Sequence, residues 1–201
     1  QTYKISLLLQ YELGGLEFPN YKGSFGLYFN FNGEKLYLLK QCPRLIKCMA
    51  DAFTEKKDSI SLLNILKLGR SVCGKCWEDS GMMLKQLDGI GLKYVRKFIN
   101  HNIMNFEQVS QLDASKIEYY LGLKPGHGNK ILKDVASIPK FSISCRLVSH
   151  EISKDLDYIT ISFNVNVQCL QGVKVTHWHK QFVMVNIVTE ISDGELVDFR
   201  R

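Results

Sequence analysis

A pair of glycines inside a helical pattern is the feature of this sequence most able to do chemistry. Residues 84–91 read LKQLDGIG, and Val95 and Phe98 follow at helical spacing, a pattern typical of a helix-hairpin-helix. Gly89 and Gly91 permit a tight turn between two helices. They also let backbone N–H groups at the start of the second helix approach a phosphate without obstruction by side chains.

Three cations follow this turn within the first two turns of the second helix, where they can add positive charge along the same nucleic-acid backbone. Contacts of this kind position a strand without reading its sequence. The alternative is a structural αα-hairpin whose glycines only allow close packing. Since the local charge is +3, we predict nucleic-acid contact by Gly89, Ile90, Gly91, Lys93, Arg96 and Lys97.

A second glycine-rich segment, residues 123–130 (LKPGHGNK), resembles a degenerate copy of the same hairpin. Phosphate contact by Lys124 or Lys130 would follow if the two hairpins pair. A loop that ends at a helix N-cap explains the same residues equally well.

The cysteines and histidines do not make a convincing metal site. Cys73 and Cys76 have the spacing of half a zinc site, but Cys42 and Cys48 lie within one predicted helix and do not complete it. We therefore interpret Cys73 and Cys76 as core thiols beside Trp77, and we expect all six cysteines to be reduced.

The C-terminal third has a candidate surface for a protein partner. His177 and His179 flank Trp178 on one face of a predicted strand, with no third metal ligand nearby. We predict docking through an exposed strand or the Trp178 surface, together with Arg200 and Arg201. Solvation, or charges that protect a sheet edge, would account for the same arginines.

No segment predicts catalysis or membrane insertion. The 201 residues contain no phosphate-binding loop, zinc-peptidase helix or nucleophile elbow, and their carboxylates are scattered singly. No apolar run approaches the roughly 18 to 20 residues that span a bilayer. Residues 65–140 carry 12 basic and 7 acidic side chains, whereas residues 141–201 carry 6 and 7. A phosphate partner would therefore be attracted to the middle of the chain.

The positional patterns predict an α+β fold in three parts. Residues 1–80 form a helical bundle, residues 81–140 the helix-hairpin-helix region, and residues 141–201 an antiparallel immunoglobulin-like β-sandwich. Only about four or five strands can be made from this last part, whereas such a sandwich has about seven strands in about 100 residues. We therefore expect an incomplete sandwich, with further strands after residue 201 or absent from this sequence.

Within these parts, hydrophobic spacing places the elements. Helical spacing predicts a helix over residues 3–13, and alternation in residues 25–38 around an Asn-Gly turn predicts a β-hairpin. Further helices are expected to open at Pro43 and Ser59, to run from 114 to 121 after a cap at Asp113, and to cover 129–137. Strands are expected at 141–147, 159–167 and 183–187, with a last hairpin turn at Asp193-Gly194.

The order of these motifs resembles the Sec-sixty-three homology domain of Ski-two-like superfamily two helicases. The resemblance covers the helix at 3–13, residues 62–70 (LLNILKLGR), 77–80 (WEDS), 84–91, 125–130 and 138–140 (IPK), followed by a β domain. Glu78-Asp79-Ser80, Lys85-Gln86-Leu87 and Lys4-Ile5-Ser6-Leu7 are most similar to meiotic crossover helicases of the Mer-three type.

The resemblance implies a nuclear, ATP-dependent DNA helicase as the parent protein, acting on meiotic recombination intermediates. ATP and Mg would bind the parent motor, and no cofactor is expected in this segment. The helical part would contact single-stranded or junction DNA. The β domain would dock a protein, for which a MutL-type mismatch-repair heterodimer is the implied partner. The family also places a linker and helix start at 18–40, against the predicted hairpin. The alternative is a scaffold for proteins only, as in spliceosomal or translocation relatives.

Overall fold

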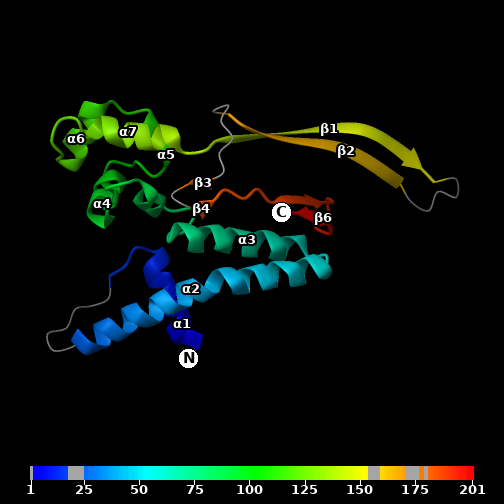
Figure 1. The fold of residues 1–201 in the computed structure, drawn as a ribbon, viewed down its shortest axis with the longest axis horizontal. Helices are drawn as coiled ribbons and strands as arrows, with labels where there is room; N and C mark the ends of the chain where they lie inside the picture. Colours follow the sequence, from blue (N-terminus) through cyan, green and yellow to red (C-terminus); the bar gives the residue numbers. More distant parts are fainter. Residues whose placement is uncertain (1, 18–24, 154–158, 171–176, 179–180) are drawn as a thin grey trace. The chain divides into compact units, whose positions relative to one another are not determined.

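The computed structural model describes residues 2–17, 25–153, 159–170, 177–178 and 181–201, and only the backbone of 25–30, 177, 178 and 181. The fold is mixed α+β, as predicted (Figure 1). One compact unit contains residues 1–136 and 186–201, and the other contains residues 137–185. The three-part division by sequence stays a prediction. The last hairpin, which we assigned to the β domain, lies in the unit that contains the helices.

The first unit begins with two helices that contact each other. Helix α1 (Thr2–Leu13) ends as predicted at a glycine pair, and Gly15 has the positive φ of 63° that favours glycine. Helix α2 (Phe25–Glu55) then covers the whole segment predicted as a hairpin, so that prediction was wrong. The alternation was short, and the helical ladder of a 31-residue helix satisfies the backbone without a strand partner.

Helix α3 (Ser59–Gly74) is joined to α2 by only three residues. Asp58, not Ser59, is its N-cap, because the Asp58 side chain accepts a hydrogen bond from the Ser61 amide at 2.9 Å. Pro43 lies inside α2 and does not open a helix. The buried side chains of Ala50 and Leu62 form the start of a core between the two helices.

A C-terminal β-hairpin completes this core. Strands β5 (Ile187–Glu190) and β6 (Leu196–Arg200) pair antiparallel around the predicted turn. Leu196 is 4% exposed and belongs to the same buried cluster as Leu62. The Ser59 hydroxyl donates to the Gly194 carbonyl at 2.6 Å, which fastens the hairpin turn to the start of α3. The chain therefore closes the helical unit with residues 135 positions away in sequence.

Five short segments form the middle of the chain: the 3-10 helix η1 (Gly81–Gln86), α4 (Leu92–Asn100), α5 (Phe106–Ser110), α6 (Ala114–Leu121) and α7 (His127–Ser137). The predicted bounds of α6 are confirmed, and α7 begins two residues before its predicted start. Their buried faces are apolar and include Leu84, Leu87, Ile90, Val95, Phe98, Val109, Ile117, Leu121, Ile131 and Val135. These short elements hold the predicted hairpin turn between η1 and α4.

The second unit consists of paired strands. β1 (Phe141–Ile152) and β2 (Ile159–Cys169) form a long antiparallel ribbon, and β3 (His177–Trp178) pairs with β4 (Gln181–Phe182). Opposed pairs on one face of the long ribbon are apolar, such as Ile143 with Val167. The strands in the described ranges form three separate two-stranded sheets, so they do not by themselves make a sandwich. A strand was predicted at 183–187, but residues 183–186 lie between β4 and β5 in no strand, and β5 begins at Ile187.

Candidate nucleic-acid interface

The turn between η1 and α4 is anchored by two buried side chains. Leu87 is 2% exposed and Ile90 is 4% exposed, while Asp88, Gly89 and Gly91 lie at the surface. The Ile90 amide donates to the Leu87 carbonyl at 3.1 Å, which closes the turn. Gly89 has a φ of 77°, a conformation that costs a non-glycine residue about 1 to 2 kcal/mol. The predicted tight turn is therefore present, although its first arm is a 3-10 helix.

The start of α4 has no capping side chain. Gly91 is the N-cap residue, with φ −85° and ψ 175°, and it has no side chain that could accept a hydrogen bond from the first amides of the helix. Within the described part of the chain, no protein oxygen accepts a hydrogen bond from the amides of Gly91, Leu92 and Lys93. A Cβ atom on Gly91 would meet nothing within 4 Å. The start of α4 therefore offers several N–H donors, at the positive end of a helix dipole, to open space.

The three predicted cations on α4 have different surroundings. Lys93 and Arg96 are exposed, and no ion pair or hydrogen bond holds their side chains among the described residues. The Lys97 ammonium instead donates to the carbonyl of Leu121 at the C-terminal end of α6 and lies 5.9 Å from the Tyr94 ring centroid. A cation there stabilises the negative end of α6. The structure therefore leaves Lys93 and Arg96 beside the free amides and ties Lys97 to a neighbouring helix.

The second glycine-rich segment joins α6 to α7, and the amide of its Gly128 is bonded to a carboxylate of the protein. The Gly128 N–H donates to Glu118 Oε1 at 2.9 Å. A Cβ on Gly128 would lie 2.1 Å from the Ala114 carbonyl oxygen, so glycine is required for this close approach. Sequence reasoning missed Glu118, whose carboxylate occupies the place that a phosphate would need at the second turn.

Lys124 and Lys130 both lie exposed at this second turn. The Lys124 carbonyl accepts from the His127 amide at 3.3 Å, which fixes the backbone and leaves the ammonium at the surface. On α7, the Asp134 carboxylate accepts from the Asp88 amide at 2.7 Å, so α7 contacts the first turn. Because residues four apart share a helix face, Lys130 lies on the same face of α7 as Asp134.

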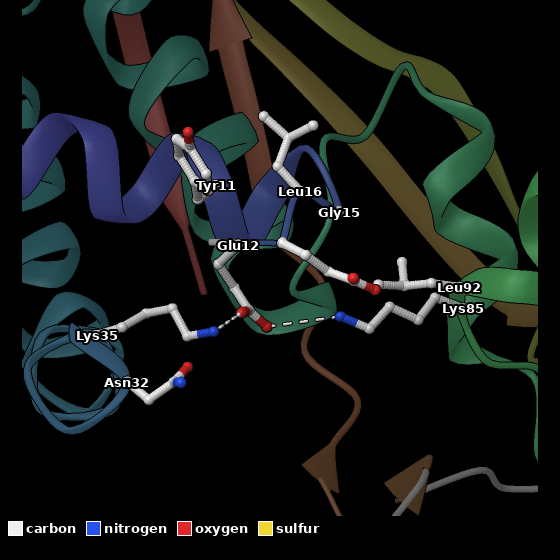
Figure 2. Close-up of a pocket in the computed structure, with 9 residues that line it drawn as sticks. Tyr11, Glu12, Gly15, Leu16, Asn32, Lys35, Lys85 and Leu92 are labelled. Atoms are coloured by element: carbon white, nitrogen blue, oxygen red, sulfur yellow. Dashed lines mark ion pairs between the residues drawn. The ribbon is translucent and has the colours of Figure 1, made fainter. Parts of the chain in front are cut away.

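An ion triad holds the first turn to the N-terminal helices. Figure 2 shows Glu12 of α1 between Lys35 of α2, at 2.7 Å, and Lys85 of η1, at 3.5 Å. The triad lines a cavity of about 180 Å³ that also includes Leu92 at the start of α4. Lys85 contributed to the local charge predicted for the hairpin, but its ammonium faces a carboxylate of the protein.

The environment of Glu12 stabilises its ionised form. Burial raises the pKa of this carboxyl group, but the hydrogen bond from Lys35 and the charges of Lys85 and Lys35 together outweigh the burial. The net pKa is lower than the ordinary value of 4.5. Glu12 therefore remains charged between two lysines and links three elements around the turn.

The residues predicted to bind a protein partner are not equivalent. Arg200 pairs with Asp198 of its own strand at 2.6 Å, and both side chains are exposed. Arg201 pairs with Asp51 of α2 at 2.7 Å and lies 5.0 Å from the Phe199 ring centroid. Of Trp178 only the backbone, in β3, is described. Arg201 thus joins β6 to the helices, whereas Arg200 points to the surface.

The cysteine prediction holds for one residue of the pair. Cys76 is 3% exposed, and burial raises the pKa of its thiol. Cys73 lies exposed near the end of α3, so its assignment to the core was wrong: it follows Val72, the last buried position of the helix, and is turned about 100° away from it around the helix axis. Among the described residues, no three His, Cys, Asp or Glu side chains are grouped to hold a metal ion. His179 lies outside the described residues.

No described helix combines the length and apolarity required to cross a membrane.

Short helical segments around two glycine turns, followed by antiparallel strands, define this chain as a mixed α+β domain. The chain belongs to the Sec63 Brl domain family, whose model matches residues 1–201. The resemblance found in the sequence is therefore confirmed.

The relatives of the chain are helicases by name. It is 44% identical over 200 residues to the ATP-dependent DNA helicase MER3 of Saccharomyces cerevisiae, covering all of this chain and 16% of that protein. It is 25% identical over 185 residues to the probable ATP-dependent DNA helicase HFM1 of Xenopus tropicalis, covering 92% of this chain and 13% of that protein. The ATP-dependent DNA helicase homolog MER3 of Arabidopsis thaliana is 33% identical over 96 residues, 48% of this chain and 8% of that protein. The chain thus spans less than a fifth of the length of these relatives.

The Glu12 triad gives a prediction about stability and pH. Replacement Glu12→Gln leaves two half-buried lysines without their carboxylate, and we expect the free energy of unfolding at pH 7 to fall by about 1 to 3 kcal/mol. Because folding lowers the pKa of Glu12, the stability that this carboxylate contributes is fully present above pH 4.5, the ordinary pKa of the group. That stability is lost as the pH falls through the folded-state pKa. Urea denaturation at several pH values should therefore show the two proteins converging in acid.

The control is Glu34→Gln, which breaks the exposed pair of Glu34 with Lys4. We expect this change to cost less than about 1 kcal/mol. Equal stabilities of wild type and Glu12→Gln at pH 7 would show that the triad does not hold the turn.

Proposed function

We propose that this chain is a non-catalytic accessory domain of an ATP-dependent DNA helicase that acts on meiotic recombination intermediates in the nucleus. The named activity of the relatives supports the parent assignment, since they are ATP-dependent DNA helicases. ATP and Mg would bind the motor of the parent protein. The domain would contribute by holding DNA, in single-stranded or junction form.

The observation that carries this proposal is the set of unpartnered amides at the start of α4. A phosphate oxygen at this position would accept from the amides of Gly91, Leu92 and Lys93. The Lys93 and Arg96 side chains, both exposed, would neutralise the same or the next phosphate. These groups contact no base edge, so the binding would be independent of sequence.

The other predicted residues would support phosphate binding less directly. Gly89 and Ile90 act through the backbone shape of the turn, since one supplies the positive φ and the other the buried anchor. Lys130, on the α7 face that meets the turn, and Lys124 would add attraction at longer range. Lys97 would act mainly by fixing α4 against α6.

We also propose how the two helical turns and the β1–β2 ribbon contribute to the architecture of the domain. The η1–α4 and α6–α7 turns would be two halves of a helix-hairpin-helix pair, linked by the Asp134 contact to Asp88. The apolar face of the β1–β2 ribbon would form one layer of an immunoglobulin-like sandwich, because an isolated two-stranded ribbon is only marginally stable.

A second part of the proposal concerns protein docking by the C-terminal third, for which a MutL-type mismatch-repair heterodimer is the partner implied by the resemblance. Arg200 is the supporting observation, because its side chain is 76% exposed while Arg201 is engaged by Asp51. Trp178, which belongs to the other compact unit, is proposed as a separate docking residue. If the hairpin is structural, the chain would be a scaffold for proteins only.

The nucleic-acid proposal predicts a loss of binding from two independent changes. Gly91→Val introduces a side chain into open space at an ordinary φ, so it should fold and block the amides. Lys93→Glu with Arg96→Glu should raise the Kd for single-stranded DNA about tenfold or more. The slope of log affinity against log salt concentration should also become shallower by about two, one for each phosphate contact that is lost. Fluorescence anisotropy over a salt series measures both quantities.

The matched control is Lys40→Glu with Lys47→Glu, which makes the same charge change at exposed positions of α2. We expect this control to retain most of the affinity. Unchanged binding by both hairpin variants, with intact folding, would leave the scaffold alternative in place.

The docking proposal predicts that Arg200→Glu reduces recovery of the MutL-type heterodimer about fivefold or more in a pull-down with purified proteins. The thermal midpoint should not change, because the Arg200 pair with Asp198 is exposed. Arg44→Glu, at an exposed arginine of α2, provides the control. Undiminished recovery with Arg200→Glu would refute docking through this residue.

A further inference from the structure

A cluster of aromatic side chains lies where the C-terminal ends of α4 and α6 meet. His101, the residue after α4, stacks on Tyr120 of α6 with ring centroids 3.8 Å apart and an interplanar angle of 13°. Tyr119 is next to this pair, with its ring centroid 6.1 Å from that of Tyr120 and tilted by 51°. We call His101, Tyr119 and Tyr120 the aromatic platform.

The exposure of the platform is unusual for side chains of this size. Tyr119 is 81% exposed, and the Tyr120 ring is its one aromatic neighbour within the described residues. His101 is also exposed on the surface. A tyrosine is a rigid, largely apolar surface, and burial of such a ring normally contributes to stability. Here folding leaves the ring of Tyr119 available for a flat apolar ligand.

Positive charge lies beside the platform on two sides of the Tyr120 position, from Lys116 and Lys97. Lys116 lies 5.8 Å from the Tyr120 ring centroid, and Lys97 reaches the Leu121 carbonyl one residue beyond it. The nearest carboxylate on the same helix is Glu118, which accepts from the Gly128 amide. An aromatic surface beside cations attracts a ligand that combines flat rings with negative charge.

The platform is aligned with the proposed phosphate site through α4. Tyr94, Lys97 and His101 follow one another at intervals of three and four residues, so they share one face of the helix. From Gly91 to His101 the helix rises about 15 Å, at about 1.5 Å per residue. Stacked bases are about 3.4 Å apart, so this distance corresponds to about four nucleotides.

We propose that the aromatic platform stacks the unpaired bases of a DNA strand whose phosphates are held at the start of α4. This inference rests on the proposed function and specifies its substrate as single-stranded DNA. In a duplex the base faces are covered by neighbouring pairs, whereas every unpaired base has a face that can stack on Tyr119 or His101. The stacking does not read sequence, in agreement with phosphate contacts that also do not.

The test uses the 201-residue chain, the variant Tyr119→Ala and the matched control Tyr119→Phe. The probes are an oligothymidylate and an abasic oligomer of the same length and charge. Tyr119→Ala should weaken binding of oligothymidylate about tenfold, within the range that one base on an aromatic side chain supplies. It should leave binding of the abasic oligomer unchanged, and Tyr119→Phe should bind both probes as the wild type does. Because Tyr119 is 81% exposed, the thermal midpoint should not move.

A covalent readout locates the contact directly. Oligothymidylate that contains 5-iodouracil should photo-crosslink to Tyr119 or His101 in the wild type, and mass spectrometry of the digested protein identifies the site. Crosslinks to neither residue, or equal binding of both probes by the wild type, would overturn the platform.

The failure of this inference is distinguishable from that of the proposed function. Lys93→Glu with Arg96→Glu should weaken the oligothymidylate and the abasic oligomer equally, because both carry the same phosphates. If those two changes weaken binding while Tyr119→Ala does not, the phosphate site is supported and the aromatic platform is refuted. If the wild type binds neither probe, both proposals are refuted.

Discussion

The first turn of α4 has backbone N–H groups for which the protein provides no acceptor among its described residues. Helices normally satisfy such donors with a capping side chain, yet the cap position here is Gly91, which has none. The donors therefore depend on water or on a ligand, and the helix dipole favours an anion. The proposed interaction with DNA depends on these donors having no acceptor in the protein. The contacts around the turn hold it in a conformation in which they stay without one.

The chain shows the alternative outcome at its second helical turn. Gly128 has the same lack of a side chain, but its amide is bound by Glu118 at 2.9 Å, and its Cα packs too closely on Ala114 for any other residue. Two similar glycine patterns thus have different consequences: one supports packing, and the other leaves donors exposed. Carboxylates also fix the place of the open turn, through Asp134 at the Asp88 amide and Glu12 at Lys85.

Local signals in the sequence predicted local structure well. The start of α6 after Asp113 and the Asp193-Gly194 turn appear where their residue types placed them, because helix starts and tight turns depend on a few neighbouring residues. The Asp113 side chain itself forms no cap hydrogen bond. The alternation in residues 25–38 misled the prediction, since a short period-two pattern is overridden when a helix continues through it. Lys97 and Glu118 illustrate the limit for the site: their partners lie 24 and 10 residues away, and no local pattern announces them.

Nuclear magnetic resonance can test, residue by residue, whether the amides at the start of α4 bind phosphate. If they do, titration of the amide-labelled chain with a short oligothymidylate should produce the largest downfield amide proton shifts at Gly91, Leu92 and Lys93. The Gly128 amide, already bonded to Glu118, should shift little. If residues 91–93 do not shift, or if Gly128 shifts more than they do, the phosphate is not bound at the start of α4.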